Sequence, residues 1–252
     1  MEAGLPKPVR DNLNPLERYG LRLVLVALTI VLVAVPFAFL LFQVLSHGPL
    51  THADISIANR LNNAVYRHHG WVVALKVISN LGKPITLGVL VVLAAAYVLW
   101  RGRRRLAAFL VVAAVGGGLV DTAVKAAVNR PRPHVDHLLV HALGKSFPSG
   151  HAMSSTVTYG ALLVVFLPVV PRAARRLVVG AVVLLLFAIG VSRLALGVHY
   201  VSDVVAGWVL GSAWLAGSIA AFEAWRADRG RKPSEPLAEG VEPEAAKDLK
   251  AG

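Results

Sequence analysis

The sequence predicts an all-α integral membrane protein: six transmembrane helices, with an interfacial helical segment between the first two spans. Two observations support this fold class. Of 252 residues, 56% are hydrophobic and only 16% are charged, whereas a soluble globular domain has about 25% charged residues. In addition, long apolar runs alternate with short clusters of Lys and Arg, which is the pattern of a multi-span membrane protein.

The basic residues give a formal net charge of +12. Such a charge can indicate nucleic-acid binding, but here the charges are confined to the gaps between apolar runs. We therefore expect a phospholipid bilayer, and no nucleic acid, as the partner. The sequence contains no cysteine, which excludes disulfides, a thiolate nucleophile and Cys-ligated metal or iron–sulfur sites. The composition does not indicate an oligomeric state.

The predicted spans are apolar runs long enough to cross a bilayer core about 30 Å thick, which requires about 20 residues in a helix. Residues 23–42 form the first span, because they carry no charge and are too long for the apolar region of a signal peptide. In the third span, Gly116, Gly117 and Gly118 allow close approach of a neighbouring helix. The other predicted spans are 85–100, 106–124, 152–170, 177–198 and 201–225.

Residues 48–83 are too polar to cross the membrane. Ile55, Ala58, Leu61 and Val65 recur at helical spacing among polar residues, which predicts one or two amphipathic helices lying in the membrane interface. Ordinary helices outside the membrane fit the same pattern equally well.

Three regions are expected along the chain. Residues 1–22 form a cytoplasmic N-terminal segment, residues 23–227 form the membrane domain, and residues 228–252 form a disordered cytoplasmic tail. The tail is predicted to be disordered because the sequence from Pro233 is rich in Pro, Glu, Ala and Lys and has no evident apolar periodicity.

The basic clusters predict the orientation. With six spans, the clusters within 7–22, 101–105, 172–176 and 226–232 fall on the same side of the membrane. The positive-inside rule places that side in the cytoplasm. The expected location is the plasma membrane, with both termini in the cytoplasm and the remaining polar loops outside.

Two cations follow the end of the third predicted span: Lys125 directly, and Arg132 seven residues later. Charges at a span end cost free energy unless they reach water or pair with an anion. The two cations can share one face if the helix continues, while Pro131 and Pro133 favour an extended segment around Arg132. Snorkelling of Lys125 to lipid headgroups is the alternative.

The second polar cluster is Pro148-Ser149-Gly150-His151, directly before the fourth span. Ser149 and Gly150 fall at the first helical turn, where free backbone N–H groups and the helix dipole favour an anion. Gly150 lets a ligand approach the backbone closely, and His151 stands beside this position. A plain helix N-cap is the alternative.

The third cluster comprises Ser192, Arg193, His199 and Asp203. Asp203 follows His199 by four residues, so its carboxylate can reach one imidazole nitrogen. That contact would fix the tautomer and make the other nitrogen a better base or nucleophile. A purely structural His–Asp pair is the alternative.

Together, the three clusters fall at one membrane face under the six-span topology. They supply three cations, an N–H-rich turn, a histidine and a His–Asp pair. This set can bind a tetrahedral phosphate and transfer it through a covalent histidine intermediate, with cations stabilising the phosphoryl oxygens. We therefore expect neither a metal nor a cofactor.

These residues also form a tripartite motif. The segments read K-x6-R-P from Lys125 to Pro133, P-S-G-H from Pro148 to His151, and S-R-x5-H-x3-D from Ser192 to Asp203. The chain therefore resembles the type 2 phosphatidic acid phosphatase superfamily over about residues 21–225. Within it, the chain is similar to the bacterial phosphatidylglycerophosphatase B-like and undecaprenyl pyrophosphate phosphatase-like branch.

The resemblance implies a six-helix membrane enzyme that hydrolyses lipid phosphate monoesters or pyrophosphates without metal, on the outer face. It implies that His199 is the nucleophile, Asp203 its orienting carboxylate and His151 the general acid. The implied phosphate-binding residues are Lys125, Arg132, Ser149, Gly150 and Arg193.

Several alternatives stay open at this point. The same site could serve a lipid-linked phosphotransferase, and a non-catalytic binding protein or a transporter belongs to another class. His134, His137 and His141 could hold a metal, although an entrance or solvent-facing role is favoured. Asp121 is expected to pair with Lys125, and Arg130 could contact lipid headgroups or substrate, with neither favoured.

Overall fold

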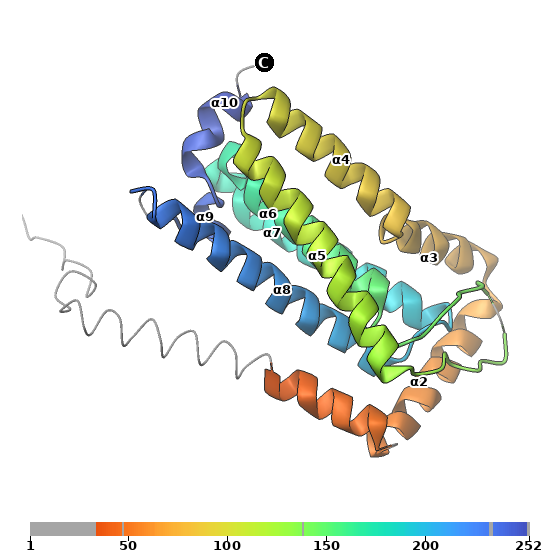
Figure 1. Ribbon diagram of the computed structural model, residues 1–252. Helices are drawn as coiled ribbons and strands as arrows, with labels where there is room; N and C mark the ends of the chain where they lie inside the picture. Colours follow the sequence, from red (N-terminus) through yellow and green to blue (C-terminus); the bar gives the residue numbers. More distant parts are fainter. Residues whose placement is uncertain (1–33, 47, 138, 232–233, 251–252) are drawn as a thin grey trace, which may run out of the picture.

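The structure is a computed structural model that describes residues 34–46, 48–137, 139–231 and 234–250; within these ranges it is helical and contains no strand (Figure 1). This confirms the all-α prediction. The described part of the first helix is Ala34–Leu45. The helices that follow are α2 (Pro49–Tyr66), α3 (His69–Leu81), α4 (Pro84–Trp100), α5 (Arg104–Val128), α6 (Gly150–Phe166), α7 (Arg172–Ala195), α8 (Val201–Ala227), α9 (Pro236–Glu239) and α10 (Ala246–Lys250), with short 3-10 turns η2 (Leu167–Val169) and η3 (Pro243–Ala245).

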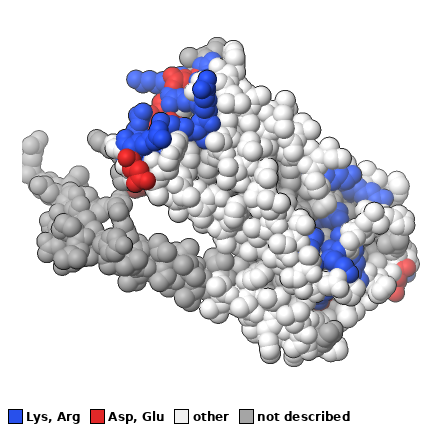
Figure 2. Space-filling model, viewed as in Figure 1, with Lys and Arg blue, Asp and Glu red and all other residues white. Residues whose placement is uncertain are grey.

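Helix α6 is the centre of the bundle and contacts α4, α5, α7 and α8. The outer helices turn large apolar side chains outward: Ile85 on α4 is 80% exposed and Leu177 on α7 is 76% exposed. Figure 2 shows the charged side chains gathered at two ends of the molecule, with an uncharged belt between them. This distribution matches a bundle whose middle lies in lipid.

Four helical segments are long and apolar enough to cross a membrane, and the number rises to six if each of two bent helix pairs forms one span. The four are α5, α6 with η2, α7 and α8; the bent pairs are Ala34–Leu45 with α2, and α3 with α4 at an angle of 43°. These helices support a multi-pass membrane protein. The exact number of six spans stays a prediction, and residues 23–33 of the first predicted span lie outside the described residues.

The polar segment between the first two predicted spans does fold into helices, α2 and α3. Their position in the membrane interface stays a prediction. Helix α5 ends at Val128, where Asn129 adopts the left-handed conformation with φ of 54° and caps the helix by donating its backbone N–H to the carbonyl oxygen of Lys125. The helix therefore does not continue toward Arg132.

Small residues bring α6 and α8 into backbone contact. A Cβ atom on Gly207 would lie 2.8 Å from the carbonyl oxygen of Ser149, and one on Gly211 would lie 2.9 Å from that of Met153. Both distances are too short for any larger residue, as in other close helix crossings built on small residues four apart. This contact fixes the first turn of α8 against the first turn of α6.

The prediction of a disordered tail over residues 228–252 is wrong for residues 234–250. Val241, Ala245 and Leu249 are buried at 0%, 0% and 6% exposure, in one core cluster with residues of α4, α5 and α6. These three residues are spaced four apart and form a short apolar stripe that the polar composition conceals. Ion pairs of Arg103 with Glu242 and Asp248 hold the stripe in place.

The docked tail gives the first testable prediction. Leu249→Asp places a charge in the core cluster, so we expect the tail to detach and a protease to cut residues 234–250 much faster than in the parent protein, since burial of a Leu contributes about 1.5–3 kcal/mol. Lys247→Asp is the matched control, because Lys247 is exposed on the same short helix. Equal cleavage rates in the Leu249→Asp and parent proteins would show that the tail is not held by this contact.

Candidate active site

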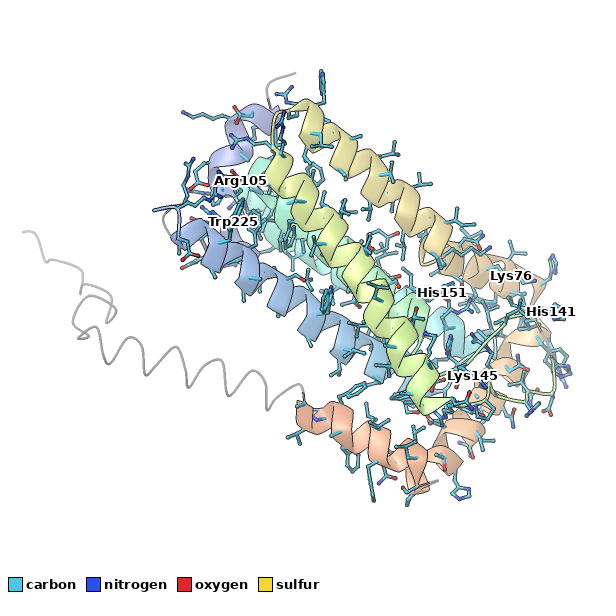
Figure 3. The ribbon with its side chains drawn as sticks, viewed as in Figure 1. Lys76, Arg105, His141, Lys145, His151 and Trp225 are labelled. Carbon is cyan, nitrogen blue, oxygen red and sulfur yellow. The ribbon has the colours of Figure 1, made fainter. Side chains whose placement is uncertain are left out.

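The three predicted clusters meet at one end of the bundle, the end at which the loop of residues 129–149 joins α5 to α6 (Figure 1). Figure 3 shows His151, Lys145 and Lys76 at this end, and Arg105 and Trp225 at the opposite end. Residues far apart in the sequence thus share one small region. Their roles in catalysis stay predictions.

His199 lies between α7 and α8 and is only 2% exposed. Its Nδ1 atom lies 3.4 Å from Oδ2 of Asp203, and its Nε2 atom lies 3.2 Å from Nη1 of Arg132. A carboxylate on one side and a guanidinium on the other select the tautomer that carries its proton on Nδ1 and its lone pair on Nε2. Burial lowers the pKa of His199 to about 4, against the opposing effect of Asp203, so the ring is neutral at physiological pH.

Arg132 extends from the loop over this histidine. Its guanidinium also donates to the carbonyl oxygens of Val198 at 2.8 Å, Leu143 at 2.9 Å and Gly144 at 3.2 Å. Backbone carbonyls do not neutralise the cation. Arg132 therefore keeps its charge beside Nε2 of His199, in the position where a bound phosphate would carry negative charge.

The Pro-Ser-Gly-His turn lies against the end of α5. Ser149 is the N-cap residue of α6 and donates its backbone N–H to the carbonyl oxygen of Asp203 at 2.9 Å. Lys125 donates to the carbonyl oxygen of Pro148 at 2.7 Å and to Asp121 at 2.5 Å, which confirms the expected Asp121–Lys125 pair. A Cβ atom on Gly150 would lie 3.2 Å from the Lys125 ammonium, so glycine keeps this turn open to the cation.

Arg193, near the end of α7, is 5% exposed and donates from Nη1 to the hydroxyl oxygen of Ser79 on α3 at 2.6 Å. Its Nε atom is buried and has no hydrogen-bond partner among the described residues. The same is true of Ser149 Oγ and His151 Nε2. Because buried polar atoms are rarely left unpaired, three such atoms from the predicted site mark a place prepared for a polar ligand.

Three further residues, Arg130, Asp54 and Ser202, form a buried network with Asp203 that sequence reasoning missed. Arg130 is buried and bridges two carboxylates, with Nη1 at 2.6 Å from Asp203 and Nη2 at 3.0 Å from Asp54 on α2. Asp54 also accepts from the backbone N–H of Ser202 at 3.0 Å, and the Ser202 hydroxyl accepts from Arg130 at 2.8 Å. Arg130 therefore holds the carboxylate of Asp203, which in turn contacts His199.

One sequence signal could have indicated Asp54. The buried residues of α2 are Asp54, Ala58 and Asn62, spaced four apart on one face. A carboxylate on the buried stripe of an amphipathic helix requires a partner. The partner itself, 76 residues away, could not be read from helical spacing.

The three loop histidines do not come together. His137 stacks on Tyr66 with ring centroids 3.5 Å apart, and its backbone exchanges hydrogen bonds with Asn62. His134 lines a different small cavity beside α2. Within the described parts of the chain, no group of three or more His, Asp or Glu side chains is arranged to hold a metal ion.

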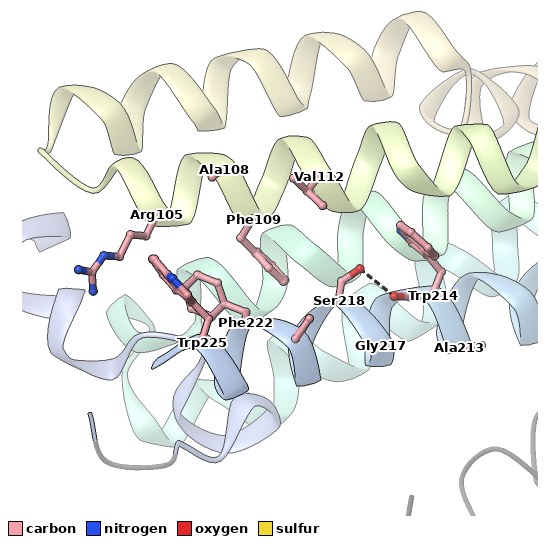
Figure 4. A pocket seen from close by; sticks show the side chains of 11 residues that line it. Arg105, Ala108, Phe109, Val112, Ala213, Trp214, Gly217, Ser218, Phe222 and Trp225 are labelled. Carbon is pink, nitrogen blue, oxygen red and sulfur yellow. Dashed lines mark hydrogen bonds between the residues drawn. The ribbon is translucent and has the colours of Figure 1, made fainter. Parts of the chain in front are cut away.

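A larger cavity of about 540 Å³ lies between α5 and α8, toward the other end of the bundle (Figure 4). Apolar side chains such as Phe109, Trp214 and Phe222 line it, with Arg105 at its edge. None of the predicted site residues contributes to it. We therefore place the candidate site around His199 and not in this cavity.

Part of the chain matches a known protein family and two curated relatives. Residues 105–227 match the PAP2 superfamily. The chain is 36% identical over 96 residues to phosphatidylglycerophosphatase B of Bacillus subtilis (37% of this chain, 46% of the relative) and 34% identical over 126 residues to lipid A 1-phosphatase of Rhizobium etli (46% and 48%). The matches thus span about half the length of the curated relatives.

Two solved structures share the fold. One is a transmembrane PAP2-type phosphatidylglycerolphosphate phosphatase from Bacillus subtilis, with a TM-score of 0.66 at 23% identity, over 79% of this chain and 97% of that one. The other is Aquifex aeolicus LpxE, with a TM-score of 0.54 at 23% identity, over 67% and 95%. The family match covers all three predicted motifs. Residues 105–227, just under half of the chain, are thus similar to the PAP2 superfamily.

Proposed function

We propose that the protein hydrolyses membrane lipid phosphates, monoesters or pyrophosphates, through a phosphohistidine intermediate and without a metal ion. The observation that carries the proposal is the environment of His199. One ring nitrogen is held by Asp203, and the other faces the Arg132 guanidinium. A neutral, oriented imidazole beside uncompensated cations is suited to attack a bound phosphate.

In the first step, Nε2 of His199 forms a bond to phosphorus while the bond from phosphorus to the lipid oxygen breaks. Lys125, Arg132 and Arg193, with the turn at Ser149 and Gly150, stabilise the charge on the phosphoryl oxygens. His151 donates a proton to the leaving oxygen. The negative charge of the bound phosphate favours the protonated form of His151, so the proton is in place when substrate is bound.

In the second step, water attacks the phosphohistidine. His151, now neutral, accepts a proton from that water, the bond between phosphorus and nitrogen breaks, and inorganic phosphate leaves. His199 returns to its neutral form with Asp203 still on Nδ1. Both histidines end as they began, so the cycle is complete.

The activity test uses purified protein in detergent and a panel of lipid phosphates. We expect release of inorganic phosphate that is insensitive to chelators and is inhibited by vanadate, an anion that can adopt the geometry of the phosphoryl transition state. The reason is that cations occupy the positions around the phosphate that a metal would take in other phosphatases. Loss of activity in chelator, restored by magnesium or zinc, would contradict the metal-free mechanism, and no phosphate release from any lipid would contradict the function.

We further propose six spans, with residues 1–22 and the tail in the cytoplasm and the active site outside. The basic clusters support this orientation through the positive-inside rule. Because the chain has no native cysteine, single cysteines report it directly. We expect Val140→Cys to react with an impermeant maleimide in intact cells. Ala173→Cys, at the start of α7, is expected to react only after permeabilisation. The reverse labelling pattern would show that the protein has the opposite orientation.

A further inference from the structure

A second polar pocket of about 310 Å³ adjoins the candidate active site. Lys76, Ser79, Asn80 and Lys83 line one wall, at positions i, i+3, i+4 and i+7 of α3 and its end, and so share one helical face. Arg193 lines the facing wall. The pocket thus gathers three cations, a hydroxyl and an amide.

The charges of this pocket are not compensated within the protein. No Asp or Glu lines it, and among the described residues Lys76 and Lys83 take part in no ion pair. Arg193 is nine-tenths or more buried, and its Nε atom has no hydrogen-bond partner in the described part of the chain. Unpaired cations around a buried, unsatisfied donor indicate a site for an anion.

The pocket and the reaction site share a wall. Arg193 belongs to both, and Ser79 fixes it by accepting a hydrogen bond of 2.6 Å from Nη1. Gly82, next to Lys83, packs so closely on His151 that a Cβ atom there would lie 3.2 Å from Cδ2 of the imidazole.

The position of this pocket beside His151 suggests that it binds the leaving group, an argument that rests on the function proposed above. If His199 attacks and His151 protonates the departing oxygen, the leaving group departs on the His151 side. A pocket of cations on that side stabilises a leaving group that is itself an anion. A lipid alcohol has no such charge, whereas the leaving group of a lipid diphosphate is a lipid monophosphate.

We propose that Lys76, Lys83 and Arg193 form a subsite for the inner phosphate of a lipid diphosphate. The outer phosphate then lies at His199. Attack of Nε2 breaks the bond from the outer phosphorus to the bridging oxygen, and the lipid monophosphate leaves with its negative charge on the lysines. The substrate class is accordingly lipid diphosphates in preference to monoesters of the same lipid.

The test compares farnesyl diphosphate with farnesyl monophosphate, which have the same tail, using the purified full chain in detergent. We expect the double variant Lys76→Gln/Lys83→Gln to lose at least about tenfold in kcat/KM for the diphosphate, the scale of one lost charge-assisted contact, and much less for the monophosphate. Lys145→Gln is the control, an exposed lysine at the same end that does not line the pocket. Equal losses for the two substrates, or no loss, would overturn the subsite.

A binding measurement separates this proposal from the proposed function. Calorimetry with inorganic pyrophosphate is expected to show about tenfold weaker binding to the Lys76→Gln/Lys83→Gln variant than to the parent protein. If the parent hydrolyses neither lipid but shows this difference, the proposed function fails and the anion subsite stands. If pyrophosphate binds both proteins equally, the subsite fails whether or not the protein is active.

Discussion

His199→Ala is expected to abolish both turnover and phosphoenzyme formation, whereas His151→Ala is expected to retain measurable hydrolysis of an activated aryl phosphate. The nucleophile has no substitute, because the bond to phosphorus forms at its nitrogen. A general acid contributes on the order of 10²–10⁴-fold, and the contribution is greatest when the leaving group is a poor one such as a lipid alcohol. An aryl oxide leaves without protonation, so loss of His151 costs little with that substrate.

Rapid-quench labelling with radioactive phosphate substrate measures both steps. The parent and His151→Ala proteins should trap an acid-labile phosphohistidine, and His199→Ala should trap none. Ser155→Ala is a useful reference, because Ser155 is buried on α6 one turn beyond His151 and has no proposed role in the transfer. A phosphohistidine in His199→Ala that is absent from His151→Ala would reverse the two roles.

Arg130→Met is expected to destabilise the protein and to remove most of its activity, although Arg130 touches no substrate in the proposed mechanism. Its guanidinium is the shared partner of Asp54 and Asp203, which are 4% and 0% exposed. Removing one partner from a buried ion network costs about 3–5 kcal/mol, because the remaining charges are left unpaired. Asp203 would then no longer be fixed against His199.

Thermal unfolding in detergent and the rate of phosphoenzyme formation report the two effects separately. Arg60→Met is the matched control, an exposed arginine on α2 near Asp54 in the sequence. Asp54→Asn should have a smaller effect than Arg130→Met, because the amide retains an acceptor for the N–H of Ser202. An Arg130→Met protein that unfolds at the temperature of Arg60→Met would show that the network contributes little.

The sequence was sufficient for those parts of the fold and site that depend on local spacing. Apolar runs predict helices α4 to α8, and the interval of four residues from His199 to Asp203 predicts their contact, which the structure confirms at 3.4 Å. The Asp54–Arg130 pair joins residues 76 apart through tertiary packing. No periodicity within one helix can indicate such a pair.

The tail shows a second limit of prediction from the sequence. Its average composition is polar, and average composition predicts disorder. What holds residues 234–250 is a stripe of three apolar side chains and a few ion pairs to Arg103 and Arg226. Such short segments order only because a preformed surface of the bundle is there to receive them.

Two contacts join the starts of α6 and α8: the backbone hydrogen bond from Ser149 to Asp203 and the close approach of the two helices at Gly207. They limit which parts of the site can change by substitution. The turn that carries His151 and the helix start that carries Asp203 form one rigid frame, so their geometry cannot drift independently. Helix α3 contributes to the neighbouring anion pocket from outside that frame. Under the proposed function, substitutions of Lys76 and Lys83 would therefore change which headgroup is accepted, whereas substitutions of Ser79 or Gly82 would also disturb Arg193 or His151.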